Sequence, residues 1–443
     1  MSALARYFNA AGKNVWGYDK TKTTLTDQLE AEGIDIHFKE NVSYVTMKME
    51  SDHYDTKNLL VIYTPAVPTE HAELVYFQTK GFDIKKRSEL LGEITKHSYT
   101  IAVAGTHGKT TTSSLIAHIL RTANIDCSAF LGGITQNYNT NLFIGKSNTT
   151  VVEADEYDRS FLTLHPDIAV ITSVDADHLD VYGNKKFMHE SYDLFAQQVK
   201  EGGKLILKEG VDEAVDITTK KSSILTYSLM DKTDYRSANL TILDGQFNYS
   251  VLSPHSAVLD ITLGIPGKHN VENSVAAVAV AQALNISDPD IRKALASFKG
   301  VKRRFEYHIK TRDLIYIDDY AHHPEELKAC ITAIRDVYPG KRITGIFQPH
   351  LYSRTRDFAD EFARSLELLD ELILMEIYPA RELPITGINS SMLLNKIKLK
   401  EKKMCSKEDL IKEVQNRDLE ILLTVGAGDI DAFIEPITKA LTK

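Results

Sequence analysis

Six consecutive residues have the types and the spacing that bind the phosphates of a nucleotide. They follow a β-rich run at 99–104 and precede a helix expected over about 109–123. Two glycines let the backbone bend so that successive N–H groups face one anion, and the helix N-terminus adds its positive end. The lysine would reach the terminal phosphates and the next hydroxyl would ligate Mg²⁺. The loop and the hydroxyl after it are Gly105, Thr106, His107, Gly108, Lys109, Thr110 and Thr111.

The match to a phosphate loop is incomplete at one position. A strict pattern would place glycine where the chain has Val103. The competing interpretation is an ordinary strand–turn–helix in which Gly-Lys-Thr occurs by chance. Three hydroxyls in a row, ending at Thr112, open an otherwise apolar helix and favour the phosphate site.

Acidic residues and a histidine follow the next two expected strands, 150–153 and 168–174. Massed carboxylates opposite a phosphate loop suit Mg²⁺, a hard cation that takes oxygen ligands. The competing interpretations are a solvated acidic loop and a structural histidine. The residues are Glu153, Asp155, Glu156 and Asp158 after the first strand, and Asp175, Asp177 and His178 after the second.

The elements that would position these residues are strands alternating with helices, which favours parallel α/β sheets. Ligands of open α/β sheets bind at the carboxyl ends of the strands. Three consecutive strand ends, at 105–110, 153–158 and 175–178, would therefore converge on one edge. The sequence predicts a nucleotide–metal site at that edge.

The length of 443 residues predicts two or three domains. We expect a first α/β domain over 1–82, a central one over 83–299 and a third, doubly wound one over 300–443. Residues 220–265 alternate with little helix and predict an antiparallel appendage on the central domain. The expected hinge is Lys299-Gly300-Val301.

Composition excludes several classes of protein. The net charge of −9 argues against a nucleic-acid partner, because such a protein needs a basic face. The sequence has no run of 18 apolar residues and no secretory signal at its start, which predicts a protein without membrane insertion. Three cysteines without metal spacing are typical of reduced thiols in the cytoplasm. They are Cys127, Cys330 and Cys405.

The motifs in order resemble those of the Mur ligases, and they span nearly the whole chain. Singly, Gly-Ala-Gly is weak, but the ordered set is highly specific. Beside the phosphate loop and the Glu-Ala-Asp-Glu segment, the resemblance rests on residues 177–182 (Asp-His-Leu-Asp-Val-Tyr), 266–270 (Pro-Gly-Lys-His-Asn), 300–306 (Gly-Val-Lys-Arg-Arg-Phe-Glu), 318–324 (Asp-Asp-Tyr-Ala-His-His-Pro), 347–350 (Phe-Gln-Pro-His) and 426–429 (Gly-Ala-Gly-Asp).

The resemblance implies three domains: a Rossmann-like N-terminal domain, a central P-loop ATPase-like α/β domain with a small antiparallel appendage, and a Rossmann-like C-terminal domain. It implies ATP and Mg²⁺ as cofactors, and UDP-N-acetylmuramate and L-alanine as substrates. Lys109 and Thr110 would hold the phosphates, and Thr110, Glu153 and His178 the magnesium. Residues near the adenine or its ribose would be His269, Asn270 and Asn273. Those that complete the site from the third domain would be Arg304, Asp319, His322, His350 and Arg354.

The implied reaction is stepwise. The lactyl carboxylate attacks the γ-phosphate to give an acyl phosphate and ADP, and the amine of L-alanine then displaces phosphate. Cations are required because two anions must meet, and Lys109, Mg²⁺ and Arg304 would supply them. Either His178 or His322 could take the proton from the ammonium group, and the sequence leaves both open.

The first domain departs from the family. The family's opening strand and Gly-rich turn would precede the helix that begins near Ala3, and Met1 stands where the turn ends. We therefore expect a truncated Rossmann-like domain in a chain that starts late relative to the natural one, since a missing central strand leaves two unpaired edges. The UDP contacts expected in this domain are Asp19 and Thr64, the latter in the turn 64–67.

Two further residues depart from the family, and two other functions remain open. Leu351 stands where many relatives carry arginine. Ala321 replaces a common glycine, which is tolerable if the local φ is negative.

One alternative function is a recycling ligase that attaches a whole peptide to UDP-N-acetylmuramate, although the segment 348–350 speaks mildly against it. The other is a regulatory module that binds and hydrolyses ATP without ligation.

Overall fold

A computed structural model describes residues 1–64, 67–175, 182–214, 222–229, 232–380 and 382–442. The chain forms two compact units. One contains Met1–Gly132 with Thr140–Tyr227, and the other contains Gly133–Asn139 with Ser228–Lys443. Among the described residues, no helix is long and apolar enough to cross a membrane.

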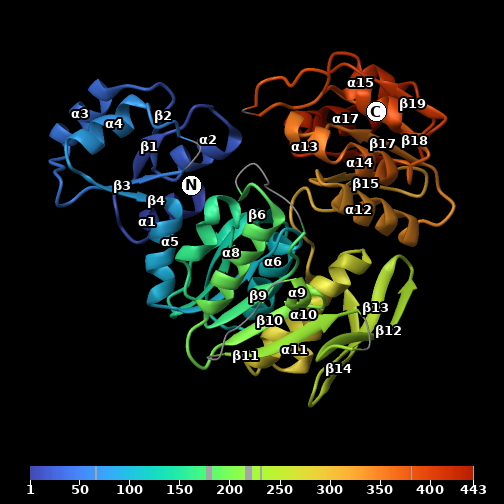
Figure 1. Cartoon of the computed structure of the whole chain (residues 1–443), viewed down its shortest axis with the longest axis horizontal. Coiled ribbons are helices and arrows are strands. Elements are labelled where there is room, and N and C mark those ends of the chain that lie inside the picture. Colours follow the sequence, from blue (N-terminus) through green and yellow to red (C-terminus); the bar gives the residue numbers. More distant parts are fainter. Residues whose placement is uncertain (65–66, 176–181, 215–221, 230–231, 381, 443) are drawn as a thin grey trace. The chain divides into compact units, whose positions relative to one another are not determined.

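The first unit begins with short strands that form two separate parallel pairs, β1 with β2 and β3 with β4 (Figure 1). Side-chain caps start two of the helices here: Thr23 accepts from the N–H of Thr26, and Asn41 from that of Tyr44. β4 pairs with β3, so the strand pairing of this segment continues past residue 82. The elements are α1 (Ser2–Ala10), β1 (Trp16–Tyr18), α2 (Thr24–Ala31), β2 (Asp35–His37), α3 (Val42–Ser51), β3 (Leu60–Tyr63), α4 (Ala72–Thr79), β4 (Asp83–Lys86) and α5 (Arg87–Lys96).

The main sheet of the first unit has the strand order β11-β10-β9-β5-β8-β6-β7. Its central strands are continuous apolar runs because both faces are covered, as parallel sheets require. Met188, Tyr192 and Phe195 of α8 pack on one face. The elements are β5 (Tyr99–Ala104), α6 (Lys109–Thr122), β6 (Ser128–Thr135), β7 (Thr140–Phe143), β8 (Thr149–Glu153), the 3₁₀ segment η1 (Tyr157–Thr163), β9 (Ile168–Ile171), α8 (Lys185–Gln197), β10 (Lys204–Lys208), α9 (Val211–Ala214) and β11 (Ser223–Ser228).

Two expectations for this sheet are corrected. β9 ends at Ile171 and not at residue 174, because the hydroxyls of Thr172 and Ser173 turn to hydrogen-bond His107 of the phosphate loop. β11 pairs parallel with β10 and so extends the parallel sheet. The antiparallel part of 220–265 is therefore limited to three later strands.

Those three strands open the second unit as an antiparallel meander followed by two helices. The Tyr249 hydroxyl hydrogen-bonds Ser274, which fixes the first helix to the sheet. The expected hinge is itself hydrogen-bonded: Gln136 donates its N–H to the carbonyl of Gly300 at 2.9 Å, and Val301 forms a β-bridge with Thr135. The elements are β12 (Tyr235–Leu243), β13 (Gln246–Leu252), β14 (Ala257–Leu263), α10 (Lys268–Ala283) and α11 (Asp288–Ser297).

The rest of the second unit is a six-stranded sheet of order β15-β16-β20-β17-β18-β19, parallel except for the edge strand β15. Alternate residues of one strand enter different apolar clusters: Leu423 packs on one face, and its neighbour Leu422 on the other. The sheet is thus doubly wound, as the sequence predicts. The elements are β15 (Glu306–Lys310), β16 (Ile315–Asp319), α12 (Pro324–Val337), β17 (Ile343–Phe347), α13 (Tyr352–Asp357), α14 (Ala359–Leu366), β18 (Glu371–Leu374), α15 (Ser390–Lys396), β19 (Glu401–Met404), α16 (Leu410–Gln415), β20 (Ile421–Val425), η2 (Asp429–Phe433) and α17 (Ile434–Leu441).

Candidate active site

The phosphate loop connects β5 to α6, as the sequence predicts, and hydroxyls from the end of β9 hold it. Thr106 donates its backbone N–H to the carbonyl of Ser173 at 3.1 Å. The two hydroxyls of these residues lie 2.8 Å apart, and the Ser173 hydroxyl also accepts the N–H of His107 at 2.8 Å. The protein's own strand end therefore holds the loop, which is what a preorganised anion site requires.

Both glycines of the loop are required by its geometry. Gly105 has φ 135°, and a Cβ atom there would lie 2.1 Å from the Thr172 hydroxyl. Gly108 has φ 83° and immediately precedes α6. Side chains other than hydrogen are strained at such φ values, so the backbone path itself selects glycine.

Lys109 is folded back on its own loop. Its ammonium group donates to the carbonyl of Gly105 at 2.5 Å and lies 2.7 Å from a carboxylate oxygen of Glu156, whose side chain is 1% exposed. Burial alone would lower the pKa of Lys109, but Glu156, Asp155 and Glu153 outweigh it and raise the pKa. The lysine is therefore charged, and carboxylates hold it in place.

Glu153 lies at the carboxyl end of β8, beside the first turn of α6. One of its oxygens accepts from the Thr110 hydroxyl at 3.1 Å, and the other accepts the N–H of Gly132 at 2.9 Å. A Cβ at Gly132 would come within 2.2 Å of this carboxylate, so only glycine allows the approach. Burial raises the pKa of Glu153, while Lys109 and Thr110 oppose the rise. A hydroxyl and a carboxylate in contact are oxygen donors of the kind that Mg²⁺ takes.

Of the other residues predicted at this edge, the structure describes some and leaves others out. His178 and Asp177 lie outside the described residues. His107 Nε2 is 3.8 Å from a carboxylate oxygen of Asp175, and Thr111 is buried in the first turn of α6. Within the described ranges, no three histidine, cysteine, aspartate or glutamate side chains gather in a way that could hold a metal ion. The structure thus brings together Thr110 and Glu153 of the predicted metal set.

The three residues predicted near the adenine open α10 in the second unit. Asn270 donates its side-chain N–H to the carbonyl of Pro266 at 2.6 Å. Its side-chain oxygen accepts from the side-chain N–H of Asn273 at 3.4 Å. Both asparagines are buried. Gly267 before the helix has φ 107°, and a Cβ there would come within 2.6 Å of the His269 ring. The start of α10 is therefore a fixed turn, and the His269 ring lies against Gly267 in it.

The carboxyl end of β16 carries His322 in a network of fixed partners. Its Nδ1 lies 3.0 Å from the carbonyl oxygen of Tyr320 and 3.2 Å from a carboxylate oxygen of Glu326. Arg304 contacts the same carboxylate at 3.6 Å and stacks over the Tyr320 ring at 5.3 Å. A carbonyl oxygen only accepts, so Nδ1 carries a proton, and Nε2 is the nitrogen at which the ring can take up or release another. His323 is separate: its ring caps α12 and faces Phe358.

Asp319 is buried beneath this network. Its oxygens accept the N–H groups of Phe305 and Ala321, both at 2.8 Å. Burial raises the pKa of Asp319 to about 6, against the opposing effects of Arg304 and the two N–H groups. In this arrangement the carboxyl group holds two turns together. Ala321 is buried and is not among the residues with positive φ, so its side chain causes no backbone strain.

His350 lies at the carboxyl end of β17, next in the sheet to β20. Its ring centroid is 5.9 Å from that of His322, at 82°, so the structure brings these two predicted residues together. Leu351 has φ 69°, a strained conformation for a leucine. Arg354 follows on α13 and is 7% exposed.

The two predicted UDP contacts follow different strand pairs. Asp19 comes after β1, where it accepts the N–H of Thr21 at 3.0 Å. Thr64 comes after β3 and accepts the N–H of Val67 at 3.0 Å. Residues 65 and 66 of the predicted turn lie outside the described residues.

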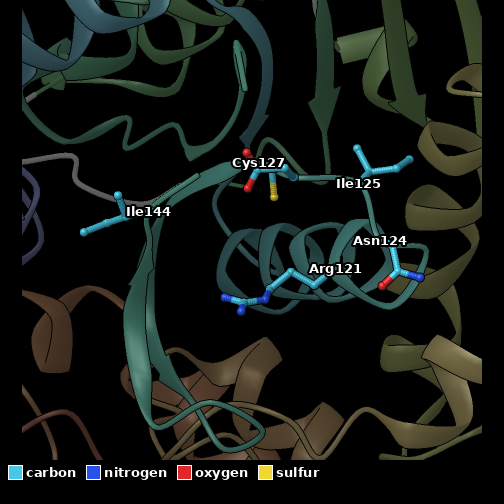
Figure 2. Close-up of a pocket in the computed structure, with 6 residues that line it drawn as sticks. Arg121, Asn124, Ile125, Cys127 and Ile144 are labelled. Carbon is cyan, nitrogen blue, oxygen red and sulfur yellow. The ribbon is translucent and has the colours of Figure 1, made fainter. Parts of the chain in front are cut away.

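A cavity of about 240 Å³ lies at the opposite edge of the first unit's sheet (Figure 2). It is formed where α6 ends and β6 begins, and Arg121 and Cys127 are among the residues that line it. The phosphate loop lies at the start of α6, so this cavity takes no part in the site. Burial raises the pKa of the Cys127 thiol to about 11, which keeps it protonated.

Sequence reasoning missed three partners of the site. Glu156 was recognised only as part of an acidic segment, and its pairing with Lys109 has no local signature. Glu326 lies only four residues after His322, in the first turn of α12, so this short-range contact could have been noticed. Tyr378, whose ring stacks on His350, follows another strand and had no signal near it in sequence.

The phosphate loop, the α/β sheets and the two clusters of polar residues at strand ends define a nucleotide-binding enzyme. Three family profiles match the chain: "Mur ligase family, catalytic domain" at residues 1–99, "Mur ligase middle domain" at 103–281, and "Mur ligase, glutamate ligase domain" at 303–428. The chain belongs to the Mur ligase family. Enzymes of this family are ATP-dependent ligases that join a carboxylic acid to an amino acid, and the chain is an enzyme of that class.

Relatives match over the full length. UDP-N-acetylmuramate–L-alanine ligases from Parabacteroides distasonis and Flavobacterium johnsoniae are 48% and 49% identical, over 100% of this chain and 95% and 96% of theirs. The crystal structure of UDP-N-acetylmuramate–alanine ligase from Thermotoga maritima is similar with a TM-score of 0.83 and 26% identity, over 100% of this chain and 96% of that one. A murein peptide ligase from Psychrobacter arcticus shares the fold, with a TM-score of 0.72 at 22% identity, over 100% of this chain and 96% of that one.

Proposed function

We propose that this enzyme uses ATP to ligate L-alanine to UDP-N-acetylmuramate in peptidoglycan precursor synthesis. One observation carries the proposal: relatives with that activity in their names match the chain from end to end at 48% and 49% identity. The geometry of both strand-end clusters supports it, because they supply what phosphoryl transfer and amide formation need. These needs are a preformed phosphate loop, fixed cations and an oriented imidazole.

The first step joins two anions. A lactyl carboxylate oxygen bonds to the γ-phosphorus of ATP, the bond from that phosphorus to the bridging oxygen breaks, and ADP leaves. Lys109 would leave Glu156 to contact the transferring phosphoryl group, and Arg304 would offset charge at the acyl phosphate. Next to the phosphate loop, Thr110 and Glu153 fit a magnesium ion, for which we also propose His178. Mg²⁺ bound there would supply charge neutralisation.

The second step forms the amide. The neutral amine of L-alanine bonds to the acyl carbon, and inorganic phosphate leaves with the oxygen that attacked ATP and takes up the proton that the nitrogen loses on becoming an amide. A base must first take a proton from the ammonium group. His322 offers Nε2 for this, since its Nδ1 is held by Tyr320 and Glu326. His178 is the other candidate, and His350 and Arg354 are the proposed contacts of the amino acid.

The remaining assignments follow the family. We propose that Asp19 and Thr64 contact the UDP group, that His269, Asn270 and Asn273 lie near the adenosine, and that Asp319 supports the nucleotide end. The proposed domains are 1–82, 83–299 and 300–443. Closure of these domains on one another would exclude water, which otherwise hydrolyses the acyl phosphate. The proposed location is the cytoplasm, where such precursors and reduced cysteines occur together.

Mass spectrometry of the products tests the proposal. The enzyme receives UDP-N-acetylmuramate, ATP, Mg²⁺ and an equimolar pool of amino acids, with a tripeptide in a parallel reaction. The expected product is the L-alanyl amide, with one ADP formed for each amide. A product formed only from the tripeptide would identify the recycling ligase instead. ADP release without any amide would identify an ATP-hydrolysing module.

A further inference from the structure

Tyr378 connects the carboxyl ends of three neighbouring strands in the second unit. It follows β18, and its backbone forms a parallel bridge with His350, which follows β17. Its N–H donates to the carbonyl of Pro349 at 2.8 Å, and its carbonyl accepts the N–H of Leu351 at 3.0 Å. The backbone of Tyr378 is thus held on both sides of His350 whatever its side chain does.

The Tyr378 ring lies parallel to the His350 imidazole. The two planes differ by 16° and their centroids are 5.8 Å apart, an offset stack. His350 also meets His322 edge to face, at 5.9 Å and 82°. Contacts with these two rings therefore restrict the orientation of the His350 imidazole.

Gly428 in the Gly-Ala-Gly segment after β20 makes room for this tyrosine. A Cβ at position 428 would lie 2.6 Å from Cβ and 2.7 Å from Cγ of Tyr378, and 2.5 Å from the side-chain oxygen of Gln348. Its φ of −87° is open to any residue, so space and not conformation selects glycine. The third strand end is thereby shaped to accept Tyr378 in this position.

We propose that Tyr378, seated over Gly428, is a positioning residue that orients His350 toward the acceptor amino acid. The inference rests on the proposed function, because it takes His350 to contact L-alanine. Tyr378 acts through the imidazole and not on the phosphates. Its loss is therefore expected to weaken use of the amino acid and to leave acyl phosphate formation intact.

Steady-state kinetics of Tyr378→Ala and Tyr378→Phe test this proposal, with L-alanine and ATP varied separately. Tyr378→Ala should raise KM for L-alanine about tenfold, the loss expected when an aromatic stack is removed. KM for ATP should stay within about twofold. Hydroxylamine trapping without L-alanine should show unchanged acyl phosphate formation. Tyr378→Phe keeps the ring and should retain the wild-type KM.

Gly428→Ala and Tyr99→Ala complete the design. Gly428→Ala leaves the tyrosine in the chain but displaces its ring, so KM for L-alanine should again rise. Tyr99 lies at the start of β5 in the other unit and is 38% exposed, so its removal should leave both KM values unchanged. An unchanged KM for L-alanine in Tyr378→Ala would overturn the inference. So would a parallel loss of acyl phosphate formation, which would indicate a structural role. If the wild-type enzyme makes no amide from L-alanine, the proposed function fails.

Discussion

The two strand-end clusters of this enzyme are built in different ways. The phosphate loop is one contiguous segment, closed on itself by Lys109 and Glu156 and braced by the strand end at Ser173. The cluster around His322 and His350 collects single residues from β16, β17, β18 and β20, over more than a hundred positions of sequence. Chemistry common to all ligases of the family can reside in a fixed local motif. We propose that recognition of the acceptor depends instead on side chains that separate strand ends bring together.

The largest expected effect on activity comes from a change in the phosphate loop. Lys109→Ala removes the cation that would meet the terminal phosphates, and no other loop residue can replace its charge. ADP release and amide formation should both fall by about 10³-fold. A coupled assay of ADP release measures this. Retention of more than a tenth of the wild-type rate would contradict the assigned role of the loop.

Gly105→Ala tests whether the loop is locally rigid. The new Cβ would meet the Thr172 hydroxyl at 2.1 Å in addition to the unfavourable φ of 135°. The free energy of unfolding should fall by about 3 kcal/mol, with loss of nucleotide binding. Gly210→Ala is the matched control: its φ is 81° but open space surrounds it, so it should cost only about 1 kcal/mol. Equal losses in urea denaturation would show that the contact with Thr172 has no effect.

Burial gives Asp319 a pH-dependent contribution to the stability of the second cluster. Its folded pKa of about 6 is above its ordinary value of 3.8. Between these values the folded state holds a proton that the unfolded state has lost, so stability falls as pH rises through this window, by up to about 3 kcal/mol. Asp319→Asn removes this titrating group. The unfolding free energy of the variant should therefore depend less on pH between about 4 and about 6, the range between the two pKa values. Urea titrations at several pH values measure it, with the exposed Asp313→Asn as control. An equal slope in the variant and the wild type would refute the account of Asp319.

The smallest expected effect concerns the ion pair between Lys109 and Glu156. Lys109 contacts Glu156 and must leave it before it reaches a phosphate. Glu156→Gln weakens that attraction, so ATP should bind about fivefold more tightly even though the fold loses some stability. Binding of a fluorescent ATP analogue measures the change. Glu190→Gln, on the exposed side of α8, is the control and should have no effect. Weaker nucleotide binding in Glu156→Gln would mean that Glu156 supports the nucleotide and does not compete with it.

Much of the fold could be predicted from sequence, for physical reasons that differ between regions. Continuous apolar runs such as β5 and β20 are visible because buried parallel strands need them. The parallel pairing of β11 with β10 could not be predicted, because an alternating pattern suits a parallel neighbour as well as an antiparallel one. The end of β9 was placed too late, since Thr172 and Val174 have high β-propensity, but the hydroxyls of Thr172 and Ser173 hydrogen-bond the loop instead.

The site shows the same division. The residues from Gly105 to Thr111 could be proposed for the site from their order alone, and His322 and His350 from motifs that resemble the family. Their partners Glu326 and Tyr378 could not, because contacts across strand ends depend on sheet order and register. The buried setting of Asp319, which raises its pKa, likewise depends on the turns at Phe305 and Ala321 that fold over it.

Isotope transfer tests the central claim of a ligase with an acyl phosphate intermediate most directly. UDP-N-acetylmuramate labelled with oxygen-18 in its lactyl carboxylate is converted with ATP, Mg²⁺ and L-alanine, and the released phosphate is analysed by mass spectrometry. The account predicts one labelled oxygen in each phosphate, together with the L-alanyl amide. Unlabelled phosphate, released at the same rate with or without L-alanine, would contradict it.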